Sequence, residues 1–320
     1  MESSLVEASG LKKHFRTKKG IVHAVDGVSF GIRPGKTMGI VGESGCGKST
    51  LGRVLVHLES NTDGAMRFGG RDVTALGKRQ LREFRQNAQM IFQDPYSSLN
   101  PRYTVEETIA EPLFLSRRYS RAELRQRTTE LMGCVGMAQR LRASYPHELD
   151  GGRRQRVGIA RALAYDPKFI VCDEPVSALD VSIQAQILNL LQDLKKEKNL
   201  TYMFITHDLS VVRYISDDIG VMYLGQLVET SPSKELFKAP CHPYTKALLS
   251  AIPHIGVRRR AERAVLKGEI TSPIDPKPGC RFASRCPHAL GECQRRSLAL
   301  EEAAPGHFVS CIRAKELNGL

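Results

Sequence analysis

Hydrophobic and polar positions follow two patterns along this chain: short apolar runs and longer stretches with helical spacing. The short runs are rich in β-branched residues and predict strands at residues 21–25, 28–32, 38–41, 168–172 and 201–205. Helical spacing is clearest at residues 183–194, and a charged helical pattern fills much of residues 96–165. Because the last two strands are mostly apolar, as in buried parallel sheets, the alternation predicts an α/β domain with a largely parallel sheet.

Length and composition are typical of a globular protein. A chain of 320 residues can bury one large core or two modest ones. A content of 41% apolar and 25% charged residues is typical of a soluble globular protein. No apolar run reaches the 18 or more residues that a bilayer-spanning helix needs. The first residues lack a basic segment followed by an apolar one, so we expect no secretory signal and a cytosolic location.

The formal net charge of +13 leaves open an anionic partner: nucleic acid, ATP or a negatively charged membrane face. Arginine-rich pieces at residues 79–85 and 258–260 supply part of this charge. Aromatic residues, which would stack on bases, do not interleave with them. We therefore interpret both pieces as solvated helix faces.

Residues 42–50, GESGCGKST, fit the phosphate-loop pattern G-x-x-x-x-G-K-[ST]. The strand predicted at 38–41 precedes them and an amphipathic stretch follows, which favours a phosphate loop over a glycine-rich surface turn. Glycines let backbone N–H groups and a helix N-terminus surround a polyphosphate. Lys48 would reach the terminal phosphates of ATP, and Ser49 would ligate Mg²⁺. The predicted ATP-binding residues here are Gly42, Ser44, Gly45, Cys46, Gly47, Lys48, Ser49 and Thr50.

A second candidate is the strand Phe169 to Cys172, which ends in Asp173 and Glu174. Adjacent residues at a strand end point to opposite sides, so Asp173 can face Mg²⁺ while Glu174 faces an attacking water. This division suits phosphoryl transfer, with Glu174 orienting or deprotonating the water. Taken alone, an Asp-Glu pair is equally typical of a solvated strand end.

Further segments occur in a fixed order around these two. Gln93 follows the apolar run 90–92, LDGGRRQR at 149–156 precedes an apolar helix, SALD at 177–180 follows the acidic pair, and His207 follows the strand 201–205. Across residues 5–235 this order resembles the nucleotide-binding subunit of an ATP-binding cassette (ABC) transporter. The resemblance implies a P-loop NTPase fold with a RecA-like core, an antiparallel β part and a helical subdomain at about residues 96–165.

The resemblance also implies roles for matching positions. Phe15 would stack on adenine from the loop before the first strands, although an aromatic residue beside His14 could equally pack in a core. Gln93 would ligate Mg²⁺ with Asp173 and couple the attacking water to the membrane partner. Asp180 would signal across a dimer, and His207 would hold the γ-phosphate. Glu174, His207 and Gln93 are thus the expected catalytic set.

Residues 92–101, 171–186 and 242–245, with the cysteine-bearing tail, resemble the oligopeptide/dipeptide permease ATPases. Within that group the chain looks similar to the second of two non-identical ATPase subunits. The implied partners are a second ABC ATPase subunit, two transmembrane permease subunits and, indirectly, a solute-binding protein, at the cytoplasmic face of the membrane. The alternative is a soluble ABC ATPase acting on nucleic acid or ribosomes. Such proteins carry a long coiled coil or two cassettes, which this sequence lacks, so we expect no nucleic-acid partner.

The signature segment departs from the family's L-S-G-G-Q, because Asp150 precedes Gly151 and Gly152. In the family this segment closes over the partner's ATP, so an ionised Asp150 would face the γ-phosphate. At roughly 4 Å and an effective dielectric near 20, that repulsion is about 4 kcal/mol per pair of unit charges. Mg²⁺, protonation, a rotated side chain, or pairing with Arg153 or Arg154 could reduce it. We hypothesise an asymmetric heterodimer; the alternative is that Asp150 has little effect.

Beyond residue 237 prolines and cysteines cluster, which divides the chain into a nucleotide-binding domain at 1–237 and a C-terminal extension at 238–320. Eight cysteines in a cytosolic chain argue against disulfides. The four in the extension, Cys280, Cys286, Cys293 and Cys311, are spaced C-x5-C-x6-C-x17-C. Four thiols in a short segment favour a metal. Members of the resembled family carry a 4Fe–4S cluster in this tail, so we expect that cluster here, with Zn²⁺ or free thiols as alternatives.

Overall fold

The computed structural model describes residues 4–251, 272–295 and 297–319, so the arginines at 258–260 lie outside the described residues. The chain forms two compact units: Met1–Ala75 with Ile205–Leu320, and Leu76–Phe204. Among the described helices, none combines the length and apolar character needed to cross a membrane. All eight cysteines are free thiols.

The first unit contains an antiparallel sheet with strand order β2-β1-β4-β5. Its strands are β1 (Val6–Thr17), β2 (Gly20–Ile32), β4 (Asp63–Phe68) and β5 (Arg71–Asp72). The sequence predicts two strands where the structure has one, β2. The pairing of β1 with β2 shifts register between Leu11 opposite Val28 and Lys13 opposite Val25. Gly27, with φ of +73°, lies at this shift, so the glycine accommodates a bulge within one strand instead of a break between two.

A second group of strands in this unit has the order β11-β12-β10-β9-β3. The strands are β3 (Thr37–Val41), β9 (Asp218–Tyr223), β10 (Gln226–Pro232), β11 (Glu301–Ala304) and β12 (His307–Val309). β3 is buried along its whole length and runs parallel to β9, as its apolar sequence predicts. The helices of this unit are α1 (Lys48–Leu55), α8 (Leu209–Ile215), α9 (Ser233–Lys238), α10 (Pro243–Ser250), the 3₁₀ turn η3 (Gly291–Gln294) and α11 (Ala314–Asn318).

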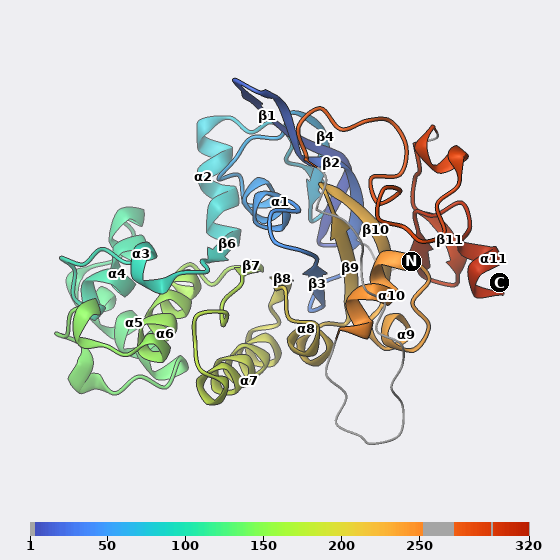
Figure 1. Ribbon diagram of the computed structural model, residues 1–320. Helices are drawn as coiled ribbons and strands as arrows, with labels where there is room; N and C mark the ends of the chain where they lie inside the picture. The colour runs from blue at the N-terminus through green and yellow to red at the C-terminus, as the bar shows by residue number, and fades with distance from the viewer. Residues whose placement is uncertain (1–3, 252–271, 296, 320) are drawn as a thin grey trace, which may run out of the picture. The chain divides into compact units, whose positions relative to one another are not determined.

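The described part of the C-terminal extension joins this unit. β12 pairs with β10, placing Val309 opposite Glu229. Phe282 is 1% exposed and packs in the same apolar cluster as Val41 and Tyr244. In Figure 1 the orange and red C-terminal elements accordingly lie beside β9 and β10. The described part of the extension therefore packs into the same apolar core as β3.

The second unit contains strands in the order β8-β7-β6: β6 (Ala88–Ile91), β7 (Phe169–Asp173) and β8 (Thr201–Ile205). Its helices are α2 (Lys78–Asn87), α3 (Pro95–Ser98), α4 (Val105–Ser116), α5 (Arg121–Cys134), α6 (Gly151–Leu163) and α7 (Val181–Lys198), with 3₁₀ turns η1 (Gln139–Leu141) and η2 (Pro146–Glu148). The predicted strands 168–172 and 201–205 and helix 183–194 are confirmed. Figure 1 shows α3 to α6 gathered in one helical group.

Candidate nucleotide-binding site

The phosphate loop connects β3 to α1, confirming the strand–loop–helix arrangement expected from its flanks. Its glycines are required by close contacts with the protein's own backbone. A Cβ on Gly42 would lie 2.1 Å from the carbonyl oxygen of Met222, and one on Gly47 would lie 1.9 Å from that of Ala24. Both residues also have positive φ, +155° and +104°. Only glycine fits at these two positions, so the loop is held in one shape by β9 and β2.

Lys48 lies inside this loop. Its side chain is buried, and its Nζ donates hydrogen bonds to the carbonyl oxygens of Gly42 (2.8 Å) and Glu43 (3.0 Å). Gly47, the N-cap of α1, has no side chain to accept hydrogen bonds from the first helical turn. Positive charge and first-turn N–H groups therefore gather at one point, with Ser49 and Thr50 following in that turn. This arrangement suits a polyphosphate anion.

Burial raises the pKa of the Cys46 thiol above its usual value. Cys46 is therefore a neutral thiol at pH 7, and it adds no negative charge to the loop. Ser44 and Gly45 are exposed at the loop's tip.

In the second unit the structure brings Gln93 and Glu174 together. The Gln93 side-chain amide donates to a Glu174 carboxylate oxygen at 2.9 Å. Glu174 has φ of +44°, a conformation that costs a non-glycine residue about 1–3 kcal/mol. Ser177 holds it there by donating from its backbone N–H (3.2 Å) and hydroxyl (3.1 Å) to the Glu174 carbonyl. Asp173, which ends β7, is buried. Sequence patterns gave no sign of the left-handed backbone at Glu174.

The signature segment opens α6, with Asp150 as its N-cap. One Asp150 carboxylate oxygen accepts from the backbone N–H of Arg153 at 2.8 Å, and the other lies 3.2 Å from the Arg153 Nε. The pairing with Arg153 that the sequence allowed is thus present. Arg154 instead donates to the carbonyl of Pro146 and lies over the ring of Tyr96. Gly151 and Gly152 follow in the first turn, where added Cβ atoms would meet Leu179 and Ile183.

Asp180, His207 and Phe15 lie in three different settings. Asp180 caps α7 by accepting from the backbone N–H of Ile183 (3.0 Å), a hydrogen bond that lowers the Asp180 pKa. His207 is exposed in the turn before α8, and Thr206 beside it donates to the carbonyl of Ile40 in β3. The expectation that Phe15 precedes the first strands is wrong, because it lies within β1, half-buried, with the Lys13 Nζ 4.8 Å from its ring centre.

Comparisons with known proteins agree with these features. The profile described as ABC transporter matches residues 25–177, and that described as oligopeptide/dipeptide transporter, C-terminal region, matches residues 228–293. The putative oligopeptide transport ATP-binding protein YkfD of Bacillus subtilis (strain 168) is 53% identical over 311 residues, 96% of this chain and 94% of YkfD. The chain belongs to the ATP-binding proteins of oligopeptide-type ABC transporters. The oligopeptide transport ATP-binding protein AppF of the same organism is 49% identical over 320 residues, 97% of each chain.

Solved structures support the same fold. The ATP-binding cassette MJ0796, in a post-hydrolysis dimer bound to ADP and Pi, has a TM-score of 0.66 and 30% identity. It covers 71% of this chain and 98% of its own. Both the family and the fold class expected from the sequence are confirmed, and the chain is an ABC ATPase that uses ATP and Mg²⁺.

This ABC ATPase places its four C-terminal cysteines within electrostatic reach of one another. Burial, followed by the charges of the other three cysteines, raises the pKa of Cys280 to about 11. Burial followed by neighbouring thiols also raises the pKa values of Cys286 and Cys311. Cys293 is buried, and its carbonyl oxygen accepts a hydrogen bond from the backbone N–H of Cys280 at 2.7 Å. Among the described residues, no three of these sulfur atoms lie within 4.8 Å of one another.

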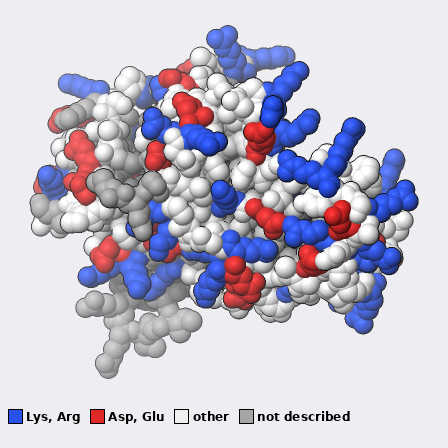
Figure 2. Space-filling model, turned by 180° about the vertical axis from the view of Figure 1, so that it is seen from behind, with Lys and Arg blue, Asp and Glu red and all other residues white. Residues whose placement is uncertain are grey.

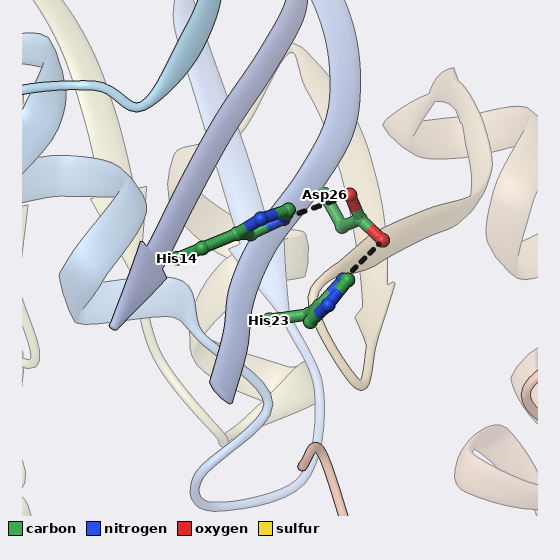
Figure 3. A group of neighbouring side chains, drawn as sticks. All are labelled: His14, His23 and Asp26. Atoms are coloured by element: carbon green, nitrogen blue, oxygen red, sulfur yellow. Dashed lines mark hydrogen bonds and ion pairs between the residues drawn. The ribbon is translucent and has the colours of Figure 1, made fainter. Parts of the chain in front are cut away.

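A group of metal-ligating side chains also lies on the β1–β2 hairpin of this ABC ATPase (Figure 3). His14 and His23 hydrogen-bond to different oxygens of Asp26, each at 3.0 Å. Their rings stack at 3.9 Å and 30°, so their in-plane lone pairs do not converge on one point. Arg281 also pairs with Asp26. Burial raises the Asp26 pKa, but the hydrogen bond from His23 and the Arg281 charge leave it below its usual value. The group therefore anchors Arg281 and is poorly shaped for a metal ion.

Basic residues are widely distributed over this ABC ATPase. Figure 2 shows lysines and arginines on the face drawn there, with acidic residues between them. Several form ion pairs within their own unit, such as Arg79 with Glu83 and Arg127 with Asp166. Such a mixed surface is typical of solvated faces.

Proposed function

We propose that this ABC ATPase is the ATP-hydrolysing subunit of a peptide importer at the cytoplasmic face of the membrane. The observation that carries the proposal is the buried Lys48 inside a glycine loop, in a chain whose C-terminal region matches the oligopeptide transporter type. Two transmembrane permease subunits and a second ATPase subunit would complete the transporter, and a solute-binding protein would deliver the peptide to it.

The chain's own residues would divide the work of hydrolysis. Lys48 and the first-turn N–H groups of α1 would bind the phosphates, and His207 would contact the γ-phosphate. Mg²⁺, when bound, supplies charge neutralisation, and Ser49, Gln93 and Asp173 would hold it. Glu174 would orient or deprotonate the attacking water. Gln93 donates a hydrogen bond to the Glu174 carboxylate. A movement of Gln93 would therefore change the orientation of the proposed catalytic base.

The membrane partners would bind the helical group of the second unit. Large apolar and aromatic side chains are exposed there, including Phe114 (68%), Leu115 (66%), Tyr96 (63%) and Tyr145 (40%). Exposed apolar residues concentrated on one group of helices are typical of a protein interface. Tyr96 belongs to the segment 93–100 that the family resemblance assigns to permease contact.

The second ATPase subunit would make an asymmetric pair with this one. Each signature segment would close over the other subunit's ATP, and here the segment presents Asp150. The ion pair with Arg153 offsets part of its charge, yet the carboxylate remains at the N-terminus of α6. We therefore propose that this chain's own loop hydrolyses ATP against an intact partner signature, while the opposite site turns over ATP poorly.

The four C-terminal cysteines would hold a 4Fe–4S cluster, with Zn²⁺ as the alternative. Buried thiols that raise one another's pKa form a site where a cation would stabilise the thiolates. Absorption at about 400 nm that disappears in a Cys286→Ser, Cys293→Ser variant would support the cluster. Stoichiometric zinc in a colourless protein would instead support a Zn²⁺ site.

The importer proposal is tested by purifying the full chain with the products of its neighbouring genes. We expect permease subunits to co-purify and the complex to hydrolyse ATP faster when a loaded solute-binding protein is present. Peptide uptake into vesicles should require ATP and stop in a Lys48→Ala complex. Co-purification with nucleic acid or ribosomes, without membrane subunits, would overturn the proposal in favour of the soluble alternative.

A further inference from the structure

We propose that Arg285, in the cysteine segment (residues 280–286), is a positioning residue for the phosphate loop. It would neutralise Glu43, the second residue of that loop, and hold the loop in its phosphate-accepting shape. The inference deepens the proposed function and rests on ATP binding at this loop. It makes a C-terminal segment, distant in sequence, part of the nucleotide site.

Arg285 and Glu43 form a bidentate ion pair. The Arg285 Nη1 lies 2.8 Å from one Glu43 carboxylate oxygen, and Nη2 lies 3.1 Å from the other. The Arg285 side chain is 7% exposed and that of Glu43 is 23% exposed. Two parallel N–H···O bonds between charged groups fix both the position and the orientation of the carboxylate. The Glu43 side chain is therefore held in one position by a buried partner.

The backbone of Glu43 is held as well. Its N–H donates to the hydroxyl of Tyr244 in α10 at 3.0 Å, and its carbonyl accepts from the Lys48 Nζ at 3.0 Å. A displacement of Glu43 would consequently move an acceptor of the lysine that should meet the phosphates. The C-terminal region thus touches this one residue through Arg285 and Tyr244, and the residue in turn contacts Lys48.

Electrostatics explain why such a clamp matters. An acidic side chain within a loop that receives a polyphosphate repels its ligand unless a cation compensates it. Arg285 supplies that compensation from a buried position, where solvent screening is weak. The Lys48 ammonium can then act on phosphate, since the Glu43 carboxylate in the same loop already has a partner. Loss of Arg285 would leave a negative carboxylate at the entrance of an anion site.

Stability alone gives a weak reason for this arrangement. The Arg285 Nε is buried and has no hydrogen-bond acceptor among the described residues. Replacing a whole buried ion pair by apolar residues is often neutral, although removing only one partner destabilises the fold. The segment has independent anchors: Phe282 packs against Tyr223 and Tyr244, and Arg281 binds Asp26 and the carbonyl of Leu224. Arg285 also donates to the Tyr223 hydroxyl at 3.4 Å, so its two shorter hydrogen bonds are those to Glu43.

The test compares full-length chains, purified with their partner subunits, by titration with MgATP, MgADP and AMP. Arg285→Ala should weaken MgATP binding about tenfold, MgADP less and AMP hardly at all, because the repulsion acts on the outer phosphates. Arg285→Lys, which keeps the charge but loses the bidentate geometry, should recover part of the loss. Arg281→Ala is the matched control: it removes a similar buried arginine of the same segment and should lower Tm while leaving MgATP affinity within about twofold.

A double-mutant cycle separates charge compensation from simple damage. In a Glu43→Gln background, Arg285→Ala should cost less than about twofold, since no carboxylate remains to repel phosphate. An equal loss of affinity in both backgrounds, or an unchanged affinity in Arg285→Ala, overturns the inference. If the unmodified chain itself shows no magnesium-dependent ATP binding, the proposed function fails. That result differs from a chain that binds MgATP equally well with and without Arg285, which overturns only this inference.

Discussion

The helices α1 and α6 use the same anion-binding device in opposite ways. Each begins with glycine-rich sequence, and under the proposed function each would face a phosphate from one side of an ATP. The N-cap of α1 is Gly47, which has no side chain to accept hydrogen bonds from the first turn. The N-cap of α6 is Asp150, whose carboxylate accepts a hydrogen bond from the Arg153 N–H of the first turn of α6 and adds a negative charge. The proposed function therefore makes the capping residue, and not the fold alone, decide how each helix N-terminus meets a phosphate.

The largest expected effect comes from a substitution that stops ATP hydrolysis but leaves ATP binding at α1 intact. Glu174→Gln should lower ATP turnover by about 10²–10⁴-fold, because an amide cannot take the proton of the attacking water. MgATP affinity should stay within about threefold, since the loop and α1 are unchanged. Turnover measured beside equilibrium ATP binding checks this. A matched change, Glu148→Gln, alters an acid of the same unit that only closes the η2 turn and should leave turnover intact. Wild-type turnover in Glu174→Gln would remove Glu174 from the mechanism.

A second prediction concerns the glycine that keeps α1 open. Gly47→Ala places a Cβ on the Ala24 carbonyl and should lower MgATP affinity by roughly 100-fold, because the loop must shift. Gly45 offers a control with positive φ, +76°, and no atom within 4 Å of its added Cβ. Gly45→Ala should therefore carry backbone strain without a clash, and its MgATP affinity should fall by less than that of Gly47→Ala. Equal affinities of the two variants would show that the close packing at Gly47 is irrelevant.

A third helix N-terminus, that of α10, extends the comparison with a neutral cap. The His242 Nδ1 accepts from the backbone N–H of Tyr244 at 3.1 Å. Burial lowers the His242 pKa to about 4, and the charge of Glu229 opposes that shift. Below pH 6.5 the unfolded chain binds a proton that the folded chain excludes. Stability should therefore fall by up to about 1.4 kcal/mol per unit as pH decreases from 6.5 towards 4.

Urea unfolding at pH 7 and pH 5 measures this slope. His242→Asn keeps a capping acceptor without a titrating group and should reduce the dependence on pH. Glu229 and His307 are hydrogen-bonded to each other, and both remain in the variant. Their contribution is therefore common to both proteins and cancels in the comparison. An identical slope in His242→Asn would assign the pH dependence to that pair instead.

Features that depend only on neighbouring residues in the sequence were predicted correctly. The phosphate loop between β3 and α1, the strand at 201–205 and the helix that became α7 all follow from residues that are neighbours in sequence. The bulge at Gly27 was not predictable, because a glycine between two apolar runs reads equally well as a turn. Phe15 was assigned to a loop because its role came from a family pattern and not from its own strand.

Long-range contacts explain most of what the sequence did not predict. Glu43 and Arg285 are 242 positions apart, and no periodicity connects them. Tyr244 reads as a core aromatic, and its hydroxyl reaches Glu43 only once α10 is packed on the first unit. Glu174 gives no sequence sign of a left-handed backbone, since glycine and asparagine are the usual residues there. Tertiary packing supplies these features, and they surround the candidate site.

The smallest expected effect bears most directly on the contrast between α1 and α6. Asp150→Ser keeps a capping hydroxyl for α6 while removing the charge, so nucleotide affinity at the site closed by this segment should rise about two- to fivefold. The change is modest because Asp150 is 59% exposed and already paired with Arg153. Asp150→Asn should match Asp150→Ser if charge is the cause, and Arg153→Gln should have the opposite effect, since it removes the compensating cation. These are measured as ATP binding and turnover of the assembled complex. No change in either Asp150 variant would mean that the carboxylate, held by its own helix, never meets the phosphate, and that α1 and α6 differ in appearance but not in function.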